Sequence, residues 1–191
     1  MVEVIVPPNQ TKFYCDSQNI TELDLSNCPD LTELWCYNNL LTELNLSNCP
    51  NLKILWCSGN EITELYLQNC PNLTYLKCNH NRLTELDLSN CPNLTELYCG
   101  RNQIKELDLQ NCPNLTRLFC DNNQLTELDL QNCPNLTYLW CFNNKITELD
   151  ISQNDKLVKI EKFYYSIHQN IEQYRLWCKE NFTYKQQYIL K

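Results

Sequence analysis

Apolar residues recur along this chain in a 21-residue pattern, LxxLxCxxNxLxxLxLxxCPx. In each half of the unit, apolar residues lie two apart with a polar or aromatic residue between them. Such period-2 alternation is typical of a half-buried strand. Asn, Ser and Pro, which favour turns, follow each half. The pattern therefore predicts two short strands per unit. Because the chain has only two glycines, asparagine is expected to supply most turn positions with positive φ.

The cysteines follow the same period. Of the 14 in the chain, all but Cys178 fall into two series spaced 21 apart. One series is Cys15, Cys36, Cys57, Cys78, Cys99, Cys120 and Cys141, and the other is Cys28, Cys49, Cys70, Cys91, Cys112 and Cys133. Self-similarity at a fixed period of about 20–50 residues indicates a solenoid, so the cysteines are first of all repeat positions.

The string LxxLxCxxNxL resembles the hallmark of leucine-rich repeats, in a short cysteine-containing subtype. Full units span residues 31–156, a partial one precedes them, and Leu157 and Ile160 open another. The resemblance implies a repeat solenoid, mostly parallel β with short turns, wound as a right-handed coil with the LxxLxCxxN halves stacked in one parallel sheet. The TELDL halves suggest a second parallel sheet on the opposite side, which would flatten the coil.

The inward columns predict the core. The leucines at positions 34 and 44 of the first full unit point inward together with their equivalents, and the cysteines share their phase. A buried free cysteine behaves as a small hydrophobe. Disulfides and metal ligation are the alternatives, but parallel side chains in a column match disulfide geometry poorly and no CxxC motif occurs. The asparagines of the motif resemble the family's asparagine ladder: Asn39, Asn60, Asn81, Asn102, Asn123 and Asn144.

Both ends of a solenoid need a cover. Residues 1–14 predict an N-terminal cap strand, and residues 15–160 the repeat solenoid. Residues 161–191 predict a helical C-terminal cap, with Tyr164, Ile167, Ile171, Tyr174 and Cys178 on one apolar stripe. A basic helix that binds a partner is the alternative for this segment.

Composition limits the possible partners and locations. With 43% apolar and 20% charged residues the chain is globular, and its net charge of −8 argues against nucleic acid or an acidic membrane surface. No apolar run is long enough to span a membrane. The first residues lack a basic n-region, so they predict no signal peptide and a cytoplasmic protein. A chain whose leader had been removed would look the same, and it would be secreted.

The outward positions of the second halves are acidic. They carry an unbroken row of glutamates, namely Glu22, Glu43, Glu64, Glu85, Glu106, Glu127 and Glu148. Beside it lie Asp24, Asp87, Asp108, Asp129 and Asp150, interrupted by Asn45 and Tyr66. Like charges about 4.8 Å apart repel by about 0.9 kcal/mol per pair in water. The regular repetition favours a solubilising face, with bound calcium or a basic partner as alternatives.

The outward positions of the first halves vary from unit to unit and hold the large aromatic residues. An exposed aromatic patch usually marks an interaction site, and Trp, Tyr and Arg are frequent in binding hot spots. The alternative is that stacked aromatics only stabilise the sheet. The predicted partner-binding residues are Trp35, Tyr37, Ile54, Trp56, Tyr75, Lys77, Tyr98, Arg117, Phe119, Tyr138, Trp140 and Phe142.

The sequence predicts a non-catalytic module that binds a protein partner and needs no cofactor or metal. Acidic pairs repeat along the whole coil, whereas a catalytic site is a single arrangement in a cleft. Two alternatives stay open. One is an extracellular glycan-binding or adhesion module, on which eight N-x-S/T sequons bear, four of them in the repeated NLT phrase. The other is a structural spacer without a ligand. The sequence indicates no oligomeric state.

Overall fold

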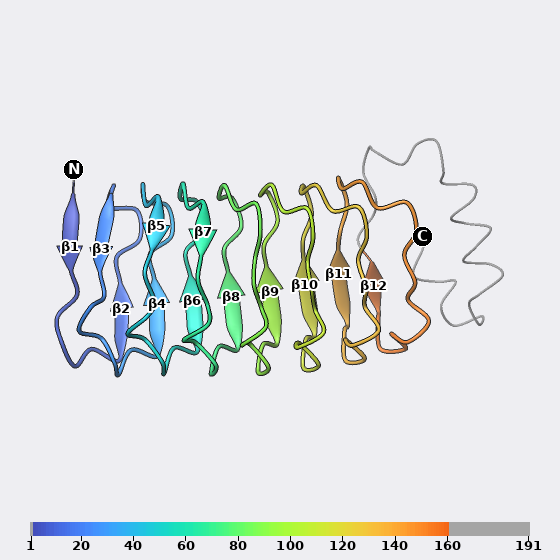
Figure 1. The fold of residues 1–191 in the computed structure, drawn as a ribbon, viewed down its shortest axis with the longest axis horizontal. Coiled ribbons are helices and arrows are strands. Elements are labelled where there is room, and N and C mark those ends of the chain that lie inside the picture. Colours follow the sequence, from blue (N-terminus) through green and yellow to red (C-terminus); the bar gives the residue numbers. More distant parts are fainter. Residues whose placement is uncertain (1, 161–191) are drawn as a thin grey trace.

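A computed structural model describes residues 2–160, and in them the turns of a solenoid lie side by side along one axis (Figure 1). The first halves of the units form one parallel sheet with the strand order β12-β11-β10-β9-β8-β6-β4-β2. Its strands are β2 (Lys12–Tyr14), β4 (Glu33–Trp35), β6 (Ile54–Trp56), β8 (Tyr75–Lys77), β9 (Glu96–Tyr98), β10 (Arg117–Phe119), β11 (Tyr138–Trp140) and β12 (Lys159–Ile160).

Equivalent positions pair across this sheet. Leu34 lies opposite Leu55, and Leu118 lies opposite Leu139. A slip by one residue would turn every leucine of a strand to solvent, so the inward pattern specifies the register. The hydrogen bonds continue past the strand ends, as from the Cys36 amide to the Trp56 carbonyl at 2.8 Å. The outward residues of successive units are therefore held in straight columns.

The second halves form a sheet only in part, which corrects the expectation of a continuous second sheet. Strand β1 (Glu3–Ile5) pairs with β3 (Glu22–Asp24), and β5 (Glu43–Leu44) pairs with β7 (Glu64–Leu65). Asn45 and Tyr66, which directly follow β5 and β7, replace aspartates of the acidic row. No strand forms around Asp87, Asp108 or Asp129, where aspartate follows aspartate from unit to unit. Like charge alone does not prevent pairing here, because Glu3 lies opposite Glu22 and Glu43 opposite Glu64 in the pairs that do form.

The first 14 residues contain both β1 and β2, so they supply strands to two sheets. Val6 is buried and Phe13 packs partly against the core. It remains a prediction that this segment caps the solenoid. The boundaries of the solenoid at residues 15 and 160 also remain a prediction. The predicted C-terminal helix and its apolar stripe lie outside the described residues. Between residues 2 and 160 no helix is long and apolar enough to cross a membrane.

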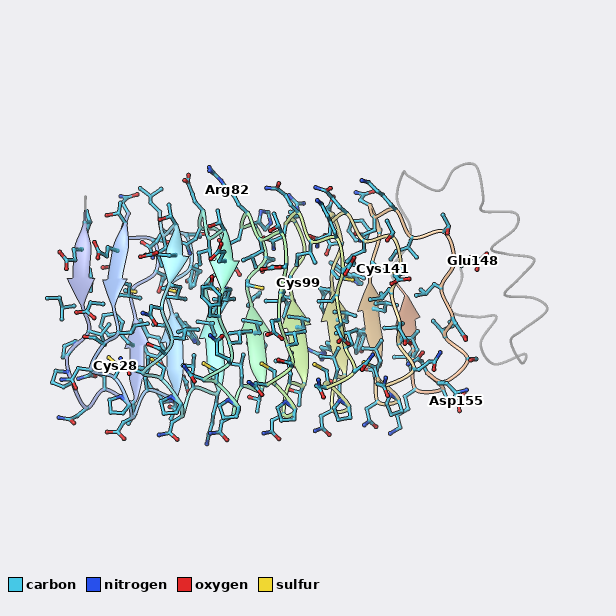
Figure 2. The ribbon with its side chains drawn as sticks, viewed as in Figure 1. Cys28, Arg82, Cys99, Cys141, Glu148 and Asp155 are labelled. Carbon is cyan, nitrogen blue, oxygen red and sulfur yellow. The ribbon has the colours of Figure 1, made fainter. Side chains whose placement is uncertain are left out.

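The cysteines belong to the core. Figure 2 labels Cys28, Cys99 and Cys141 along the coil, and all 13 cysteines of the described part are buried and free. Burial raises the pKa of Cys57 and Cys99 to about 12, so these thiols stay protonated at neutral pH. Packed, protonated thiols are what the inward phase of the cysteine positions predicted.

The predicted asparagine ladder is present. The side-chain amide of Asn60 donates to the Cys36 and Cys57 carbonyls, at 3.0 Å each, and its oxygen accepts from the Leu41 amide at 3.1 Å. The other ladder asparagines repeat this arrangement. Asn60 itself is only 8% exposed. Each ladder asparagine thus satisfies backbone groups of two units, which would cost about 1–3 kcal/mol each if left unpaired.

The repeated NLT phrase forms a second ladder. The Asn93 amide donates to the Pro71 carbonyl at 3.0 Å, and the Thr95 hydroxyl donates to the Thr74 carbonyl at 2.9 Å. Asn72, Asn114 and Asn135 bond in the same way to prolines one unit back. Linking adjacent units is sufficient reason for this phrase to recur, so its sequons have a structural explanation.

Candidate interaction surface

The main sheet brings the predicted binding residues together on one surface, which we call the aromatic face. It comprises Trp35, Tyr37, Ile54, Trp56, Tyr75, Lys77, Tyr98, Arg117, Phe119, Tyr138, Trp140 and Phe142. Ten of them are strand residues, and Tyr37 and Phe142 follow two residues after the ends of β4 and β11. Arg117 is exposed and the other eleven are half-buried.

The rings at the N-terminal end of the face pack on one another. The centroids of Trp35 and Trp56 are 5.2 Å apart in an edge-to-face arrangement, and Tyr37 stacks on Trp56 at 4.7 Å. Tyr14 extends this group, with its ring 4.9 Å from that of Trp35. The predicted set omitted Tyr14 although it begins the same column, and at 49% exposure it is more open than its neighbours.

Lys77 connects the two halves of the face. Its ammonium lies 4.2 Å from the ring centre of Trp56 and 5.0 Å from that of Tyr98. Burial lowers the pKa of Lys77 and the charge of Glu96 opposes that shift, but no carboxylate of residues 2–160 forms an ion pair with it. The face therefore holds a partly desolvated cation between two aromatic rings.

The rings continue from Lys77 to the C-terminal end of the face. Tyr98 and Phe119 are nearly parallel, at 5° and 4.6 Å between centroids. Phe119 meets Trp140 edge to face at 4.7 Å, and Trp140 lies 6.2 Å from Phe142. Because Tyr98 and Phe119 cover one face of each other's ring, less of each ring surface is free for a ligand.

The charged residues that interrupt the aromatic columns are paired with their neighbours. Arg117 lies 3.5 Å from Glu96 and 5.1 Å from the ring of Tyr138, and the Tyr98 hydroxyl donates to Glu96 at 2.7 Å. At the other end of the face, Lys12 lies 2.7 Å from Glu33 and lowers the pKa of that carboxyl. The aromatic rings do stack on one another, and Lys77, unlike these four charged residues, forms no ion pair within residues 2–160.

The aspartates of the second halves have a structural role that the sequence reasoning missed. Asp87 accepts a hydrogen bond from the backbone amide of Ser89 at 2.9 Å, which lowers the pKa of its carboxyl. The side-chain oxygen of Asn45 accepts the equivalent hydrogen bond from the Ser47 amide at 3.0 Å. The turn is therefore kept where asparagine replaces aspartate. The two-residue spacing of Asp or Asn before Ser or Gln was the available signal. Across residues 2–160 no group of three or more His, Cys, Asp or Glu is placed to share a metal ion.

Comparison with known families matches the chain to a model of leucine-rich repeats in two copies. The matches cover residues 29–69, 71–111 and 113–164. A comparison with curated proteins finds no match.

Solved structures are similar to this chain over most of its length. The functional domain of InlJ from Listeria monocytogenes, described as including a cysteine ladder, is 37% identical over 80% of this chain and 39% of its own, with a TM-score of 0.66. YopM from Yersinia enterocolitica is 30% identical over 83% of this chain and 38% of its own, with a TM-score of 0.68.

A leucine-rich-repeat protein of Leptospira interrogans has a TM-score of 0.74 at 24% identity, over 78% of this chain and 42% of its own, which shows a shared fold. The chain spans about two fifths of the length of each of these three structures.

Proposed function

Because the chain belongs to the leucine-rich-repeat family, we propose that it is a non-catalytic module that binds a protein partner through the aromatic face. The observation that carries this proposal is the position of Lys77, a cation held between Trp56 and Tyr98 that forms no ion pair among the described residues. A carboxylate of the partner would complete this arrangement. Arg117, which is exposed, would supply a second contact to acidic groups.

The packing of the face suits a binding surface. Trp, Tyr and Arg are the residue types that contribute most to protein interfaces. The rings of Trp35, Tyr37 and Trp56 already hold one another in place, so little side-chain entropy is left to lose when a partner binds. Pre-organised aromatic side chains bind more tightly than mobile ones for this reason.

The geometry favours a protein over a sugar as ligand. An aromatic platform for a sugar needs an open ring face, whereas Tyr98 and Phe119 stack on each other at 4.6 Å. The spacer alternative explains the packed rings but not the choice of lysine at position 77, because an aromatic residue there would continue the column. A protein partner with an acidic group accounts for both observations.

Site-specific photocrosslinking tests the proposal. Benzoylphenylalanine would replace Tyr75 on the aromatic face or, as the matched control, Tyr66, which is 57% exposed and belongs to the acidic row. Both proteins would be irradiated in native extract and the adducts identified by mass spectrometry. We expect a protein adduct at position 75 that excess unlabelled wild type suppresses and Lys77→Glu abolishes, with none at position 66.

Adducts at position 66 alone would move the interface to the acidic row and contradict the proposal. Adducts at position 75 that survive Lys77→Glu would contradict the role given to the lysine. No specific adduct at either position would favour the spacer. Melting curves of each variant establish that it is folded.

A further inference from the structure

The turns that follow β2, β4, β6, β8, β9, β10 and β11 share one equivalent position with positive φ. Its values lie between 53° and 67° at Ser17, Asn38, Gly59, His80, Arg101, Asn122 and Asn143. These positions are 21 residues apart, so the residue type that each unit places in this conformation can be compared directly. Glycine and asparagine suit this conformation because glycine lacks a Cβ and the short asparagine side chain bonds locally.

Arg101 does not fit the backbone it occupies. Its φ is 55°, a region in which a long side chain without a local hydrogen bond is unfavourable. His80, in the preceding unit, has a φ of 57°, although histidine tolerates this region better than arginine. Residues that are poor for their backbone conformation concentrate at functional sites, because something other than stability selects them.

Two further basic residues lie near these turns in the same units. Arg82 follows His80 by two residues, and Lys105 stands where the other units have threonine, at positions 42, 63, 84, 126 and 147. The His80 amide donates to the Gly100 carbonyl at 3.0 Å, which places the turns of His80 and Arg101 on adjacent rungs about 4.8 Å apart. We call His80, Arg82, Arg101 and Lys105 the basic edge; Arg82 marks it at the upper margin of Figure 2.

The basic edge is open to solvent. All four side chains are exposed. Arg82 forms an ion pair with Glu61 at 3.2 Å, whereas Arg101 and Lys105 form none with any residue from 2 to 160. The chain as a whole has a net charge of −8. A group of basic residues in an acidic protein, two of them without an ion pair among residues 2–160, is a departure that the repeat itself does not require.

We infer that the basic edge binds an acidic segment of a protein, with carboxylates bridging the two adjacent units that carry His80 and Arg101. The site spans only two units, which matches a short segment with a few carboxylates. A nucleic acid or an anionic membrane would meet the net negative charge of the remaining chain, and such polyanions bind through many phosphate contacts. The inference does not depend on the aromatic face, so either proposed site can be disproved without affecting the other.

The test restores the repeat consensus. Arg82→Gln, Arg101→Asn and Lys105→Thr, combined in one variant, introduce residues that other units already carry at these positions. The matched control, Lys53→Thr/Lys145→Gln/Lys156→Gln, removes three positive charges elsewhere. Fluorescence anisotropy would follow a labelled peptide of alternating Asp and Ser at low ionic strength, with a short DNA duplex and phosphatidylserine vesicles as competing ligands.

We expect the peptide to bind wild type and the control alike, and the consensus variant about tenfold more weakly, since three surface contacts are lost. Added salt should weaken the wild-type binding. If both variants lost the same amount of peptide affinity, net charge alone would explain the binding, and the inference would be overturned. So would tighter binding of DNA or vesicles than of the peptide, or no peptide binding to wild type at millimolar concentration.

Discussion

The ammonium of Lys77 lies 4.2 Å from the centre of the Trp56 ring, in a column where positions 14, 35, 56, 98, 119 and 140 carry aromatic side chains. The lysine reaches Tyr98 on its other side at 5.0 Å. One cation thereby joins the ring cluster of β4 and β6 to that of β9, β10 and β11. Trp56 stands at the junction, since it also contacts Trp35 and Tyr37.

Trp56→Ala should lower the free energy of unfolding by about 2–3 kcal/mol. It removes two ring contacts and one cation–π contact in addition to buried apolar area. Chemical denaturation monitored by circular dichroism would measure the change. Tyr66→Ala is the control, because Tyr66 is 57% exposed and outside the ring network, and it should change stability little. Equal effects of the two substitutions would show that the rings do not support the sheet.

Asn81→Ala should destabilise the protein by about 3 kcal/mol. The Asn81 amide donates to the Cys57 and Cys78 carbonyls at 3.0 Å each, and its oxygen accepts from the Ile62 amide at 3.1 Å. The substitution leaves these buried backbone groups unpaired.

Asn90→Ala is the comparison for this ladder position. It removes one exposed bond, to the Gln68 carbonyl at 3.3 Å, and should cost less than about 0.5 kcal/mol. Urea denaturation midpoints of the two variants would decide the question. A shift for Asn81→Ala no larger than that for Asn90→Ala would contradict the structural role of the ladder.

Arg101→Asn should raise the free energy of unfolding by about 1 kcal/mol, because asparagine relieves the strain at a φ of 55°. Differential scanning calorimetry would show a higher melting temperature. Gln103→Asn, an exposed change two residues away, should leave it unchanged. If the inference about the basic edge holds, the stabilised variant also binds acidic peptide more weakly. A destabilised Arg101→Asn protein would refute the claim of strain.

The core thiols should react only when the solenoid opens. Burial excludes reagents from Cys57 and Cys99, and their pKa of about 12 removes the reactive thiolate at pH 8. In a Cys178→Ser background, alkylation in native buffer should therefore follow the unfolding rate. Mass spectrometry of quenched samples would count the labelled sites. Rapid modification of several cysteines without denaturant would be incompatible with the packed columns.

The aspartate turns should make part of the stability acid-sensitive. The amides of Ser26, Ser89 and Ser152 lower the pKa of Asp24, Asp87 and Asp150. A carboxyl with a lower pKa in the folded than in the unfolded chain adds stability above its unfolded pKa. That contribution is lost as pH falls through the folded value, below about pH 4.

Asn45 shows that an amide can hold the same turn, so Asp24→Asn/Asp87→Asn/Asp150→Asn should keep the fold while removing the titration. Its melting temperature should fall less between pH 7 and pH 2.5 than that of wild type. An identical fall in both proteins would assign acid sensitivity to other groups.

Much of the fold could be predicted because a 21-residue period combined with a period of two admits a single register. Leu34 and Leu55 point inward, so Trp35 and Trp56 must share the outer surface, and they pair directly. Asn60 was predictable in the same way, since a polar residue in an inward column needs backbone partners.

What the tertiary structure alone decided are contacts between side chains of different units. Whether position 77 would point to solvent or lie between Trp56 and Tyr98 depends on side-chain torsions and neighbouring volumes, which the repeat pattern does not encode. The sequence predicted the aspartates only as an outward acidic row. The hydrogen bond from the Ser89 amide to Asp87 became evident only in the folded backbone. The strain at Arg101 was likewise absent from the pattern. The sequence by itself determined which residues face in and which face out, because alternation follows from backbone geometry, and packing in three dimensions decided which of them meet.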